Sequence, residues 1–490
     1  MAALVASLLV ILASVGDATA QADQPDVYAT VGSEPAGQTM APGFVGLSLE
    51  YKAVRAYTGS NPNAINPVLV QLLRQLAPGQ APVLRIGGDS TDATWWPVRG
   101  VIPPGGVSYS LTPGWMRTTR ALTDAVGAHL IMGINLATGR PALAAAEGRA
   151  ILRGLGRGHI DAFEIGNEPD LYSVFPWYRD RNKAVWFSRP HFYSLGSLVR
   201  EFSRWRSVLP SVPAAGPALA ELTWLSGLPR FLSSEHGLGL VTVHRYPLRG
   251  CIRDASDPSY ATIPNLLNDQ ASTGLAQAVA PYVATAHARG VRFRLDELNS
   301  VSCSGKRGVS DTFASALWML DTLFNLASVG VDGVNVHSLP GAAYEPLSFT
   351  QTRGSWRAFV HPEYYGMLMF GQAFPPGARL VPVTSTSGPV KIWATRSPDG
   401  SLRIVLINKD TAAAHTVQLQ APGIGRQSTL EWLQAPSASA TSGVTFGGRT
   451  FGTTTTSGLL TGPLQLDQTF SLLNSYTLNL PPASAVLLSQ

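Results

Sequence analysis

Charged residues are scarce in this chain, and cysteine is nearly absent. Asp, Glu, Lys and Arg make up 14% of the 490 residues against 45% hydrophobic residues, so a large core can form and global disorder is disfavoured. The formal net charge is only +5, and no dense run of Lys or Arg occurs. The composition therefore argues against nucleic-acid binding and leaves a mild preference for anionic substrates.

Long apolar runs are also missing beyond the N-terminus, where none reaches the roughly 20 residues of a membrane span. Residues 2–15 form a short apolar run, and small residues follow at 18–20. This pattern is typical of a signal peptide with a cleavage site. We expect a signal peptide over residues 1–20 and a secreted or periplasmic protein; a buried N-terminal strand or helix is the alternative.

The two cysteines, Cys251 and Cys303, each follow a predicted strand end by a few residues. Both are expected in loops at one face of the protein. In an exported protein this arrangement favours a disulfide, the alternative being two unpaired thiols. Two cysteines without nearby histidines are a poor zinc signal, so no metal is expected.

Eight strand-like apolar runs recur along the first three quarters of the chain, with amphipathic stretches between them. The runs are 44–49, 83–86, 129–134, 162–165, 212–218, 240–243, 292–295 and 333–336. The helical stretches are 64–76, 113–126, 142–155, 191–209, 275–288 and 310–329. Eight alternating strand and helix units predict an α/β fold, a closed (β/α)8 TIM barrel, over residues 41–376.

The sequence pattern changes from alternating strands and helices to short strands after a last helical stretch at 363–374. Short strand-like runs then alternate with turn residues such as those at 398–400; the runs are 390–395, 402–407, 417–419, 430–433, 476–480 and 485–488. They predict a β-sandwich domain over residues 377–490. Within the segment 21–40, the run 26–31 is expected to form a strand that pairs with this sandwich.

Two glutamates mark the ends of two predicted barrel strands. Glu168 lies in the segment 160–169 (IDAFEIGNEP), and Glu297 in the segment 292–299 (RFRLDELN). The carboxyl ends of barrel strands meet at one face, where active sites of this fold lie. Glycoside hydrolysis needs two such carboxyl groups, one to exchange a proton and one to meet the developing positive charge. The alternative for Glu168 is an Asn-Glu pair that caps the next helix.

Asp296 directly precedes Glu297, so the two side chains should lie on opposite faces of the strand or be splayed by a bulge. We choose Glu297 as the nucleophile. Asp296 is expected to form an ion pair with a barrel arginine such as Arg294. The alternative is that both acids are solvated loop residues.

Four motifs in order carry a family resemblance: 44–50 (FVGLSLE), 85–89 (RIGGD), 164–169 (EIGNEP) and 336–339 (VHSL). Together they resemble the heparanase-like β-glucuronidases of glycoside hydrolase family 79. These belong to the clan of retaining (β/α)8 glycosidases whose acid/base follows strand four and whose nucleophile ends strand seven. The likeness covers nearly the whole chain after the predicted signal peptide. It implies a secreted retaining β-glucuronidase that acts by double displacement on a β-glucuronide carbohydrate, without a cofactor.

The resemblance also implies roles for residues at matching positions. Glu168 matches the acid/base and Glu297 the nucleophile. Asn167 matches the neighbour that holds the sugar 2-hydroxyl. Tyr246 matches a tyrosine that bonds the nucleophile. Tyr344 belongs to a loop that receives the uronate carboxylate through backbone N–H groups and a phenol.

Other residues at strand ends keep two interpretations. Glu50 matches an acid that binds hydroxyls of the terminal sugar; alternatively it pairs with an arginine such as Arg85. His337 and His244 end two strands, and each either contacts substrate or has a structural role.

The loop after the second strand holds Asp89, a candidate substrate contact, followed by Trp95 and Trp96. These three form either a sugar-binding platform or part of the loop packing. The chain also departs from the family, because relatives can carry a further carboxylate-binding tyrosine shortly after the nucleophile, where 300–303 reads SVSC.

Two rival functions follow from the same residues. One is an endo-acting, heparanase-like enzyme with an open basic cleft, to which Lys306 and Arg307 could contribute. The other is a non-catalytic carbohydrate-binding barrel, against which the presence of both glutamates argues. No nucleic acid, membrane span or obligate protein partner is expected.

Overall fold

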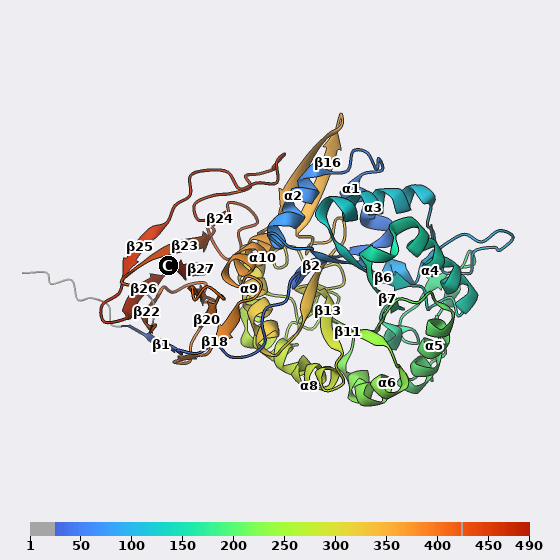
Figure 1. The fold of residues 1–490 in the computed structure, drawn as a ribbon, viewed down its shortest axis with the longest axis horizontal. Coiled ribbons are helices and arrows are strands. Elements are labelled where there is room, and N and C mark those ends of the chain that lie inside the picture. Colours follow the sequence, from blue (N-terminus) through green and yellow to red (C-terminus); the bar gives the residue numbers. More distant parts are fainter. Residues whose placement is uncertain (1–24, 423–424) are drawn as a thin grey trace, which may run out of the picture.

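The computed structural model describes residues 25–422 and 425–490, so the predicted signal peptide lies outside the described residues. Within this range eight parallel strands close into a barrel in chain order (Figure 1). They are β2 (Val45–Glu50), β3 (Val83–Gly87), β6 (His129–Ile134), β7 (Ile160–Ile165), β10 (Ala214–Leu219), β11 (Leu238–Arg245), β13 (Arg292–Leu298) and β15 (Gly333–Ser338). Each overlaps one predicted run, so the (β/α)8 barrel is confirmed.

The barrel strands are readable in the sequence because helices cover them. Strands buried on both faces appear as nearly continuous apolar runs, and β2, β10 and β15 are buried along their whole length. The surrounding helices include α2 (Pro67–Leu76), α3 (Pro113–Val126), α4 (Pro141–Leu155), α5 (Leu195–Val208), α6 (Leu228–Ser234), α8 (Leu275–His287), α9 (Phe313–Ser328) and α10 (Pro362–Ala373). Local signals fix their starts: Asn66 and Thr112 cap α2 and α3, each followed by proline.

The C-terminal part of the chain forms two packed sheets. One contains β19 (Val383–Ser385), β1 (Val27–Val31), β22 (His415–Gln420) and β26 (Ser475–Leu480). The other contains β18 (Arg379–Val381), β20 (Val390–Arg396), β21 (Leu402–Asn408), β27 (Ser484–Ser489), β23 (Gln427–Gln434), β24 (Thr445–Phe446) and β25 (Asp467–Phe470). A separate apolar cluster, including Val31 and Val417 from the first sheet and Ile404 and Val486 from the second, lies between them. The arrangement is a β-sandwich.

Helix α9 lies between the barrel and the sandwich (Figure 1). This position explains why the helix is buried from Phe313 through Leu326. Asp321 on its sandwich side accepts hydrogen bonds from Trp393 Nε1 at 3.0 Å and Lys409 Nζ at 3.0 Å. No helix in the described part of the chain is long and apolar enough to cross a membrane.

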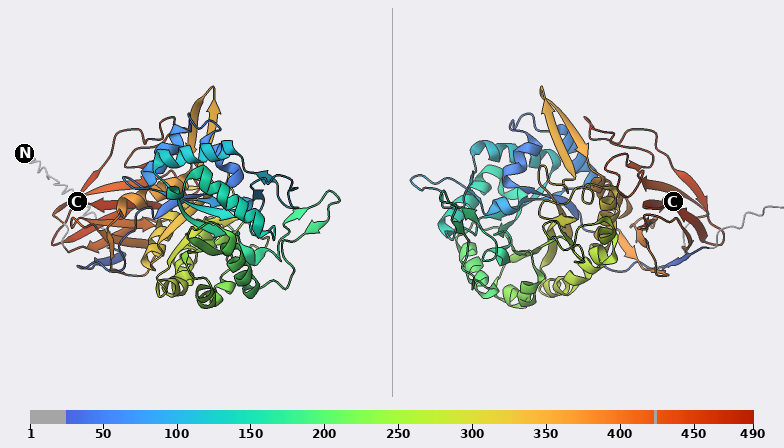
Figure 2. Two further views of the ribbon diagram at one scale, coloured as in Figure 1. Left: turned by 45° about the vertical axis from the view of Figure 1, so that its right-hand side comes forward. Right: turned by 180° about the vertical axis from the view of Figure 1, so that it is seen from behind.

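The sequence did not predict the short strands that form hairpins and sheet edges. Strands β16 (Leu347–Thr352) and β17 (Ser355–Val360) form a hairpin that rises from the barrel, and β8 (Tyr178–Arg179) and β9 (Val185–Trp186) form a second projecting hairpin (Figure 2). Strands β18, β19, β24 and β25 of the sandwich were also missed. Edge strands and hairpins of two to six residues, often half exposed, lack the apolar runs that mark the barrel strands.

Candidate active site

The C-terminal ends of the barrel strands bring a buried cluster of charged residues together. Arg85 from β3 is its centre, and its side chain is fully buried. Its Nη1 donates to Oε2 of Glu297 at 2.5 Å, and its Nη2 donates to Oδ1 of Asn167 at 2.9 Å. Its Nε donates to Oε2 of Glu164 at 2.7 Å. One guanidinium thus fixes groups from three other parts of the barrel, using the fork geometry of arginine.

Glu297 is held as a carboxylate by several groups. Besides Arg85, the phenol of Tyr246 donates to its Oε1 at 2.8 Å. Burial opposes its ionised form, but His337, His244 and Arg85 outweigh burial and hold the pKa of Glu297 well below its usual range. Of these, only Arg85 carries a permanent charge, because burial lowers the pKa of both histidines. An ionised carboxylate with fixed orientation is what a nucleophile requires.

Glu168 is in the opposite electrostatic state. Burial, followed by the negative charges of Glu297 and Asp89, raises its pKa well above the usual value. The residue has a left-handed backbone, with φ of 49°, before Pro169 begins a 3-10 turn. Such strained positions occur at functional sites. Its Oε1 lies 3.0 Å from Nδ1 of His244.

The two glutamates are close neighbours. A carboxylate oxygen of Glu168 lies within 4.8 Å of one of Glu297, with His244 next to both. The side chain of Glu168 is 18% exposed and that of Glu297 is 9% exposed, so both are reached from solvent. A retaining glycosidase places its carboxyl groups roughly 5–5.5 Å apart, whereas an inverting one leaves about 6.5–9.5 Å for a water molecule. An oxygen–oxygen distance below 4.8 Å agrees with the shorter separation of the retaining type.

Asn167 is fixed from two sides. Its Oδ1 accepts from Arg85, and its Nδ2 donates to Oδ1 of Asp89 at 3.4 Å. Its backbone N–H donates to Asp92, which also accepts from the phenol of Tyr172 at 2.6 Å. The amide thus stands beside the acid/base candidate in one orientation, and Asp89 lies beside it with an exposed side chain.

Glu50 does not pair with Arg85, so that alternative is wrong. Its carboxylate accepts from the backbone N–H groups of Asp89, at 3.1 Å, and Ser90, at 2.7 Å. Gly88 permits this approach, because it has φ of 70° and a Cβ there would lie 2.5 Å from Glu50 Oε1. Burial and the negative charges of Asp89 and Glu297 raise the pKa of Glu50 to about 7.

His337 joins the cluster, and so does Tyr344. His337 Nδ1 lies 3.1 Å from Ser48 Oγ, and its Nε2 lies 3.8 Å from Glu50 Oε1. The ring of Tyr344 lies 6.0 Å from that of Tyr246 and 5.9 Å from that of His337. The structure therefore brings all the predicted strand-end residues to one site.

The loop around Tyr344 was expected to offer several backbone N–H groups to a substrate carboxylate, but most of these groups already have partners. The backbone N–H groups of Gly341, Ala342 and Ala343 donate within the protein, to Glu345 Oε2, Leu339 O and Ser304 O respectively. These amides are therefore not free to bind a carboxylate. A contact with a substrate carboxylate from this loop would use the Tyr344 phenol or the backbone N–H of Tyr344.

Asp296 lies against a barrel arginine, as predicted, but that arginine is Arg85 and not Arg294. Arg294 instead donates to Asn335 and to the carbonyls of Gly43, Phe44 and Val334, at the other end of the barrel. Asp296 Oδ2 lies 3.5 Å from Arg85 Nε. The register of β13 against β11 and β15 shifts around Asp296, so the bulge alternative holds and both acids face the barrel interior.

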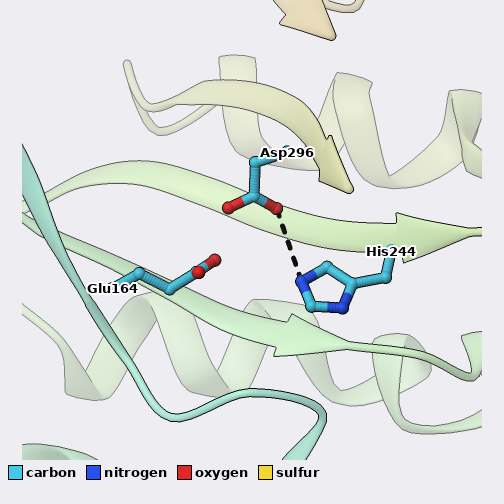
Figure 3. Close-up of side chains that lie close together, drawn as sticks. All are labelled: Glu164, His244 and Asp296. Atoms are coloured by element: carbon cyan, nitrogen blue, oxygen red, sulfur yellow. Dashed lines mark ion pairs between the residues drawn. The ribbon is translucent and has the colours of Figure 1, made fainter. Parts of the chain in front are cut away.

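The sequence did not single out Glu164 as a site residue, and it left His244 with two interpretations. Glu164 lies on β7 within a predicted strand, and its side chain is fully buried opposite Asp296 and His244 (Figure 3). His244 contacts both catalytic candidates. For Glu164 the sequence did carry a signal, a glutamate inside an apolar strand. Glutamates are almost never fully buried unless they are paired, so this position indicates a buried charged partner.

The two tryptophans in the loop after β3 do not form a sugar-binding platform. Trp95 is 4% exposed and donates its indole N–H to Ser110, and Trp96 packs against the main core. These contacts favour the packing alternative.

Cys251 and Cys303 form a disulfide with Cα atoms 5.8 Å apart, so the predicted bridge is present. It ties the loops after β12 (Leu248–Arg249) and β14 (Val301–Ser302), two strands that pair at the barrel rim.

Two side-chain groups offer a combination of His and carboxylate atoms that could bind a metal: Glu164, His244 and Asp296, and Glu168, His244 and Glu297. Arg85 already lies against both groups, contacting Glu164, Asp296, His244 and Glu297. Its permanent positive charge takes the place that a cation would occupy, and we assign no metal site to these residues.

The barrel and the paired glutamates define a (β/α)8 glycoside hydrolase. Residues 392–487 match the family described as the glycosyl hydrolase family 79 C-terminal beta domain. A β-glucuronidase from Neurospora crassa is 25% identical over 418 residues, covering 74% of this chain and 71% of that protein. A β-glucuronidase from Aspergillus niger is 24% identical over 422 residues, covering 78% of this chain and 74% of that protein. The chain is therefore similar to glycoside hydrolase family 79 proteins in its C-terminal domain, and to two fungal β-glucuronidases over about three quarters of its length.

Solved structures share the fold. The 4-O-α-L-rhamnosyl-β-D-glucuronidase from Fusarium oxysporum, in complex with Rha-GlcA, matches with a TM-score of 0.72 at 18% identity, covering 94% of this chain and all of that one. A GH51 arabinofuranosidase from Xanthomonas axonopodis pv. citri matches with a TM-score of 0.68 at 16% identity, covering 95% of this chain and all of that one. The combination of barrel and C-terminal sheets is therefore shared with these glycosidases.

Proposed function

We propose that this enzyme hydrolyses β-linked glucuronides with retention of configuration. The observation that carries the proposal is the pairing of Glu168 and Glu297, which lie within 4.8 Å of each other and have pKa values shifted in opposite directions. Neighbouring carboxyl groups with pKa values pushed apart divide into an acid and a nucleophile.

The first step is attack by ionised Glu297 on the anomeric carbon, while Glu168 gives its proton to the glycosidic oxygen. The leaving group departs, and a covalent glycosyl ester with Glu297 forms. Esterification removes the negative charge that helped to raise the pKa of Glu168, so this residue now stays ionised and is available as a general base. It takes a proton from water while the water oxygen attacks the anomeric carbon, which breaks the bond to Glu297, frees its carboxylate and releases the sugar with its original configuration.

The glucuronide preference is supported by the named activities of the two fungal relatives and by the position of Tyr344. Its side chain is only 5% exposed, beside the Tyr246 phenol that bonds the nucleophile. A buried phenol is a donor for an anionic group, and a uronate carboxylate needs such donors in a site with little water. Asn167 is proposed to bind the 2-hydroxyl, and Glu50, Asp89 and His337 other hydroxyls of the sugar.

We also propose that the protein is exported and that residues 41–376 form the catalytic domain, with residues 377–490 as the sandwich domain. The disulfide supports export, since such bonds persist in oxidising compartments. The N-terminal strand β1 is proposed to belong with the sandwich, because it pairs with β19 and β22.

An assay with aryl glycosides tests the proposed function. The enzyme should cleave an aryl β-glucuronide faster than the matching β-glucoside or α-arabinofuranoside, and NMR should detect the β-anomer of glucuronate first. Glu297→Ala serves as the inactive control for contaminating activity. Initial release of the α-anomer would contradict retention, and a preference for the glucoside would contradict the substrate. Activity restricted to long polymers would favour the endo-acting alternative.

A further inference from the structure

We propose that Asp296 is un-ionised at neutral pH and shares one proton with Glu164, and that this pair beneath the catalytic site lets Arg85 hold Glu297. Asp296 is then a positioning residue, acting on the nucleophile through Arg85. The kinetic part of this proposal rests on the proposed hydrolysis, but its protonation part does not.

The first observation is a set of carboxyl oxygens without a donor. Both side chains are fully buried. Among the described residues, Glu164 Oε1 and both oxygens of Asp296 have no hydrogen-bond partner when the two groups are taken as carboxylates. The two carboxyl groups nevertheless lie next to each other (Figure 3), with an oxygen of one within 4.8 Å of an oxygen of the other. Two ionised carboxylates can only accept, so a single proton between them supplies the missing donor.

The second observation is the charge around Arg85. Three carboxyl groups, those of Glu164, Asp296 and Glu297, surround this one guanidinium at side-chain exposures of 0–9%. If all three were ionised, two negative charges would remain uncompensated in the interior. Burial of unpaired charge is costly, and neighbouring carboxylates respond by retaining a proton.

The geometry indicates which residue carries the proton. Glu164 Oε2 lies 2.7 Å from both Nε and Nη2 of Arg85, the distance of a charge-assisted bond. Asp296 Oδ2 lies 3.5 Å from Nε, without a hydrogen bond to it. In agreement, burial and the charge of Glu164 raise the pKa of Asp296 well above its usual range. Burial opposes ionisation of Glu164 too, but Arg85 outweighs it and lowers that pKa.

His244 is not the missing donor. Its Nε2 lies 3.7 Å from Asp296 Oδ1, too far for a hydrogen bond, and 3.2 Å from Nη2 of Arg85 (Figure 3 shows the Asp296 contact). Since Arg85 can only donate, Nε2 accepts and the ring proton lies on Nδ1, where it faces Glu168. The titratable groups that face Asp296 are Glu164 on β7, Arg85 on β3, His244 on β11, and Glu297 and Arg294 on its own strand.

The shared proton has a consequence for the nucleophile. With Asp296 neutral, Arg85 contacts two carboxylates, Glu164 on one side and Glu297 on the other, and only one negative charge is left in excess instead of two. An ionised Asp296 would add a negative charge next to Glu297, which would favour protonation of the nucleophile and of Glu168. The proton on Asp296 thus keeps Glu297 ionised and Glu168 within a range where it can exchange its proton.

Infrared difference spectroscopy tests the protonation state without substrate. The substitution Asp296→Asn keeps the size and a donor, and at pH 7 the spectrum of wild type minus variant should show the carbonyl band of one un-ionised carboxylic acid. The control is Asp269→Asn, at an exposed aspartate that pairs with Lys391 and Lys409. That difference spectrum should show carboxylate bands. Carboxylate bands for Asp296→Asn, or a metal ion bound at stoichiometry and lost in that variant, would overturn the proposal.

The pH profile tests whether Asp296 is neutral in the working enzyme. Asp296→Asn should leave both limbs of the profile in place, since a neutral group replaces a neutral group. If Asp296 is ionised in the wild type, the same change removes a charge and should move both limbs to lower pH by about one unit or more, which would refute the proposal. Inactivity of the wild type on glucuronides would refute the proposed function instead, with the infrared result unaffected.

Discussion

The phenol of Tyr246 donates a hydrogen bond of 2.8 Å to Oε1 of Glu297, while Arg85 holds the other oxygen at 2.5 Å. Tyr246→Phe removes a donor to the ionised nucleophile, so the pKa of Glu297 should rise. The acidic limb of the kcat/KM profile should then move to higher pH, with a loss on the order of 1.5–3 kcal/mol in transition-state stabilisation. An unmoved acidic limb would show that Tyr246 does not act through Glu297.

Tyr344→Phe should discriminate between substrates instead. The loss of its phenol should cost on the order of 1.5–3 kcal/mol in kcat/KM for an aryl glucuronide, the range for a hydrogen bond to a charged group. The matching glucoside or xyloside lacks the carboxylate and should be affected far less. Equal losses on both substrates would show that Tyr344 shapes the site without contacting the acid, and would favour a neutral β-glycoside as substrate.

Glu50 should make stability depend on pH. Its folded-state pKa, about 7, is above its ordinary value of 4.5. Its contribution to the free energy of unfolding is therefore fully present below about pH 4.5 and is lost as the pH rises through 7. Glu50→Gln should flatten the decrease in Tm between pH 5 and pH 8, with Glu34→Gln at an exposed position as the control. The same pH dependence in wild type and Glu50→Gln would contradict the raised pKa.

The disulfide should stabilise the folded chain mainly by restricting the unfolded one. Cys251 and Cys303 are 52 residues apart, for which loop-closure entropy gives an upper estimate of about 4 kcal/mol. Replacing both cysteines by serine should lower the free energy of unfolding in denaturant titrations by no more than this. Thiol titration of the denatured, unreduced protein should find no free thiol, whereas two titratable thiols would refute the bridge.

Much of the fold was predictable because of how the barrel is buried. Strands covered on both faces, such as β10 and β15, must be apolar along their length, and the sequence shows that directly. The positions of Glu168 and Glu297 followed from strand ends for the same reason. In the hairpin β16–β17, only β17 alternates buried with more exposed residues, over six positions, while β16 is buried at its first residue alone, which is too little pattern to separate from a loop.

The ion pairs of the site could not be predicted from the order of residues. Asp296 was expected to pair with Arg294, which has the right spacing on the same strand. The pairing with Arg85 depends on barrel closure, which brings β3 and β13 to one interior, and on the bulge at Asp296. Likewise, nothing local in the sequence places Glu164 opposite Asp296, because they come from separate strands joined only through the closed barrel.

The assignment of Glu297 as nucleophile and Glu168 as acid/base is the central claim, and azide rescue tests it most directly. Removal of the acid should lower kcat/KM by on the order of 10²–10⁴-fold for substrates whose leaving group needs a proton. With an activated aryl glucuronide and azide, Glu297→Ala should yield the α-glycosyl azide, because azide enters the space of the missing nucleophile. Glu168→Ala should yield the β-glycosyl azide, formed by attack on the glycosyl ester of Glu297. The reverse pair of products, identified by NMR, would contradict the account.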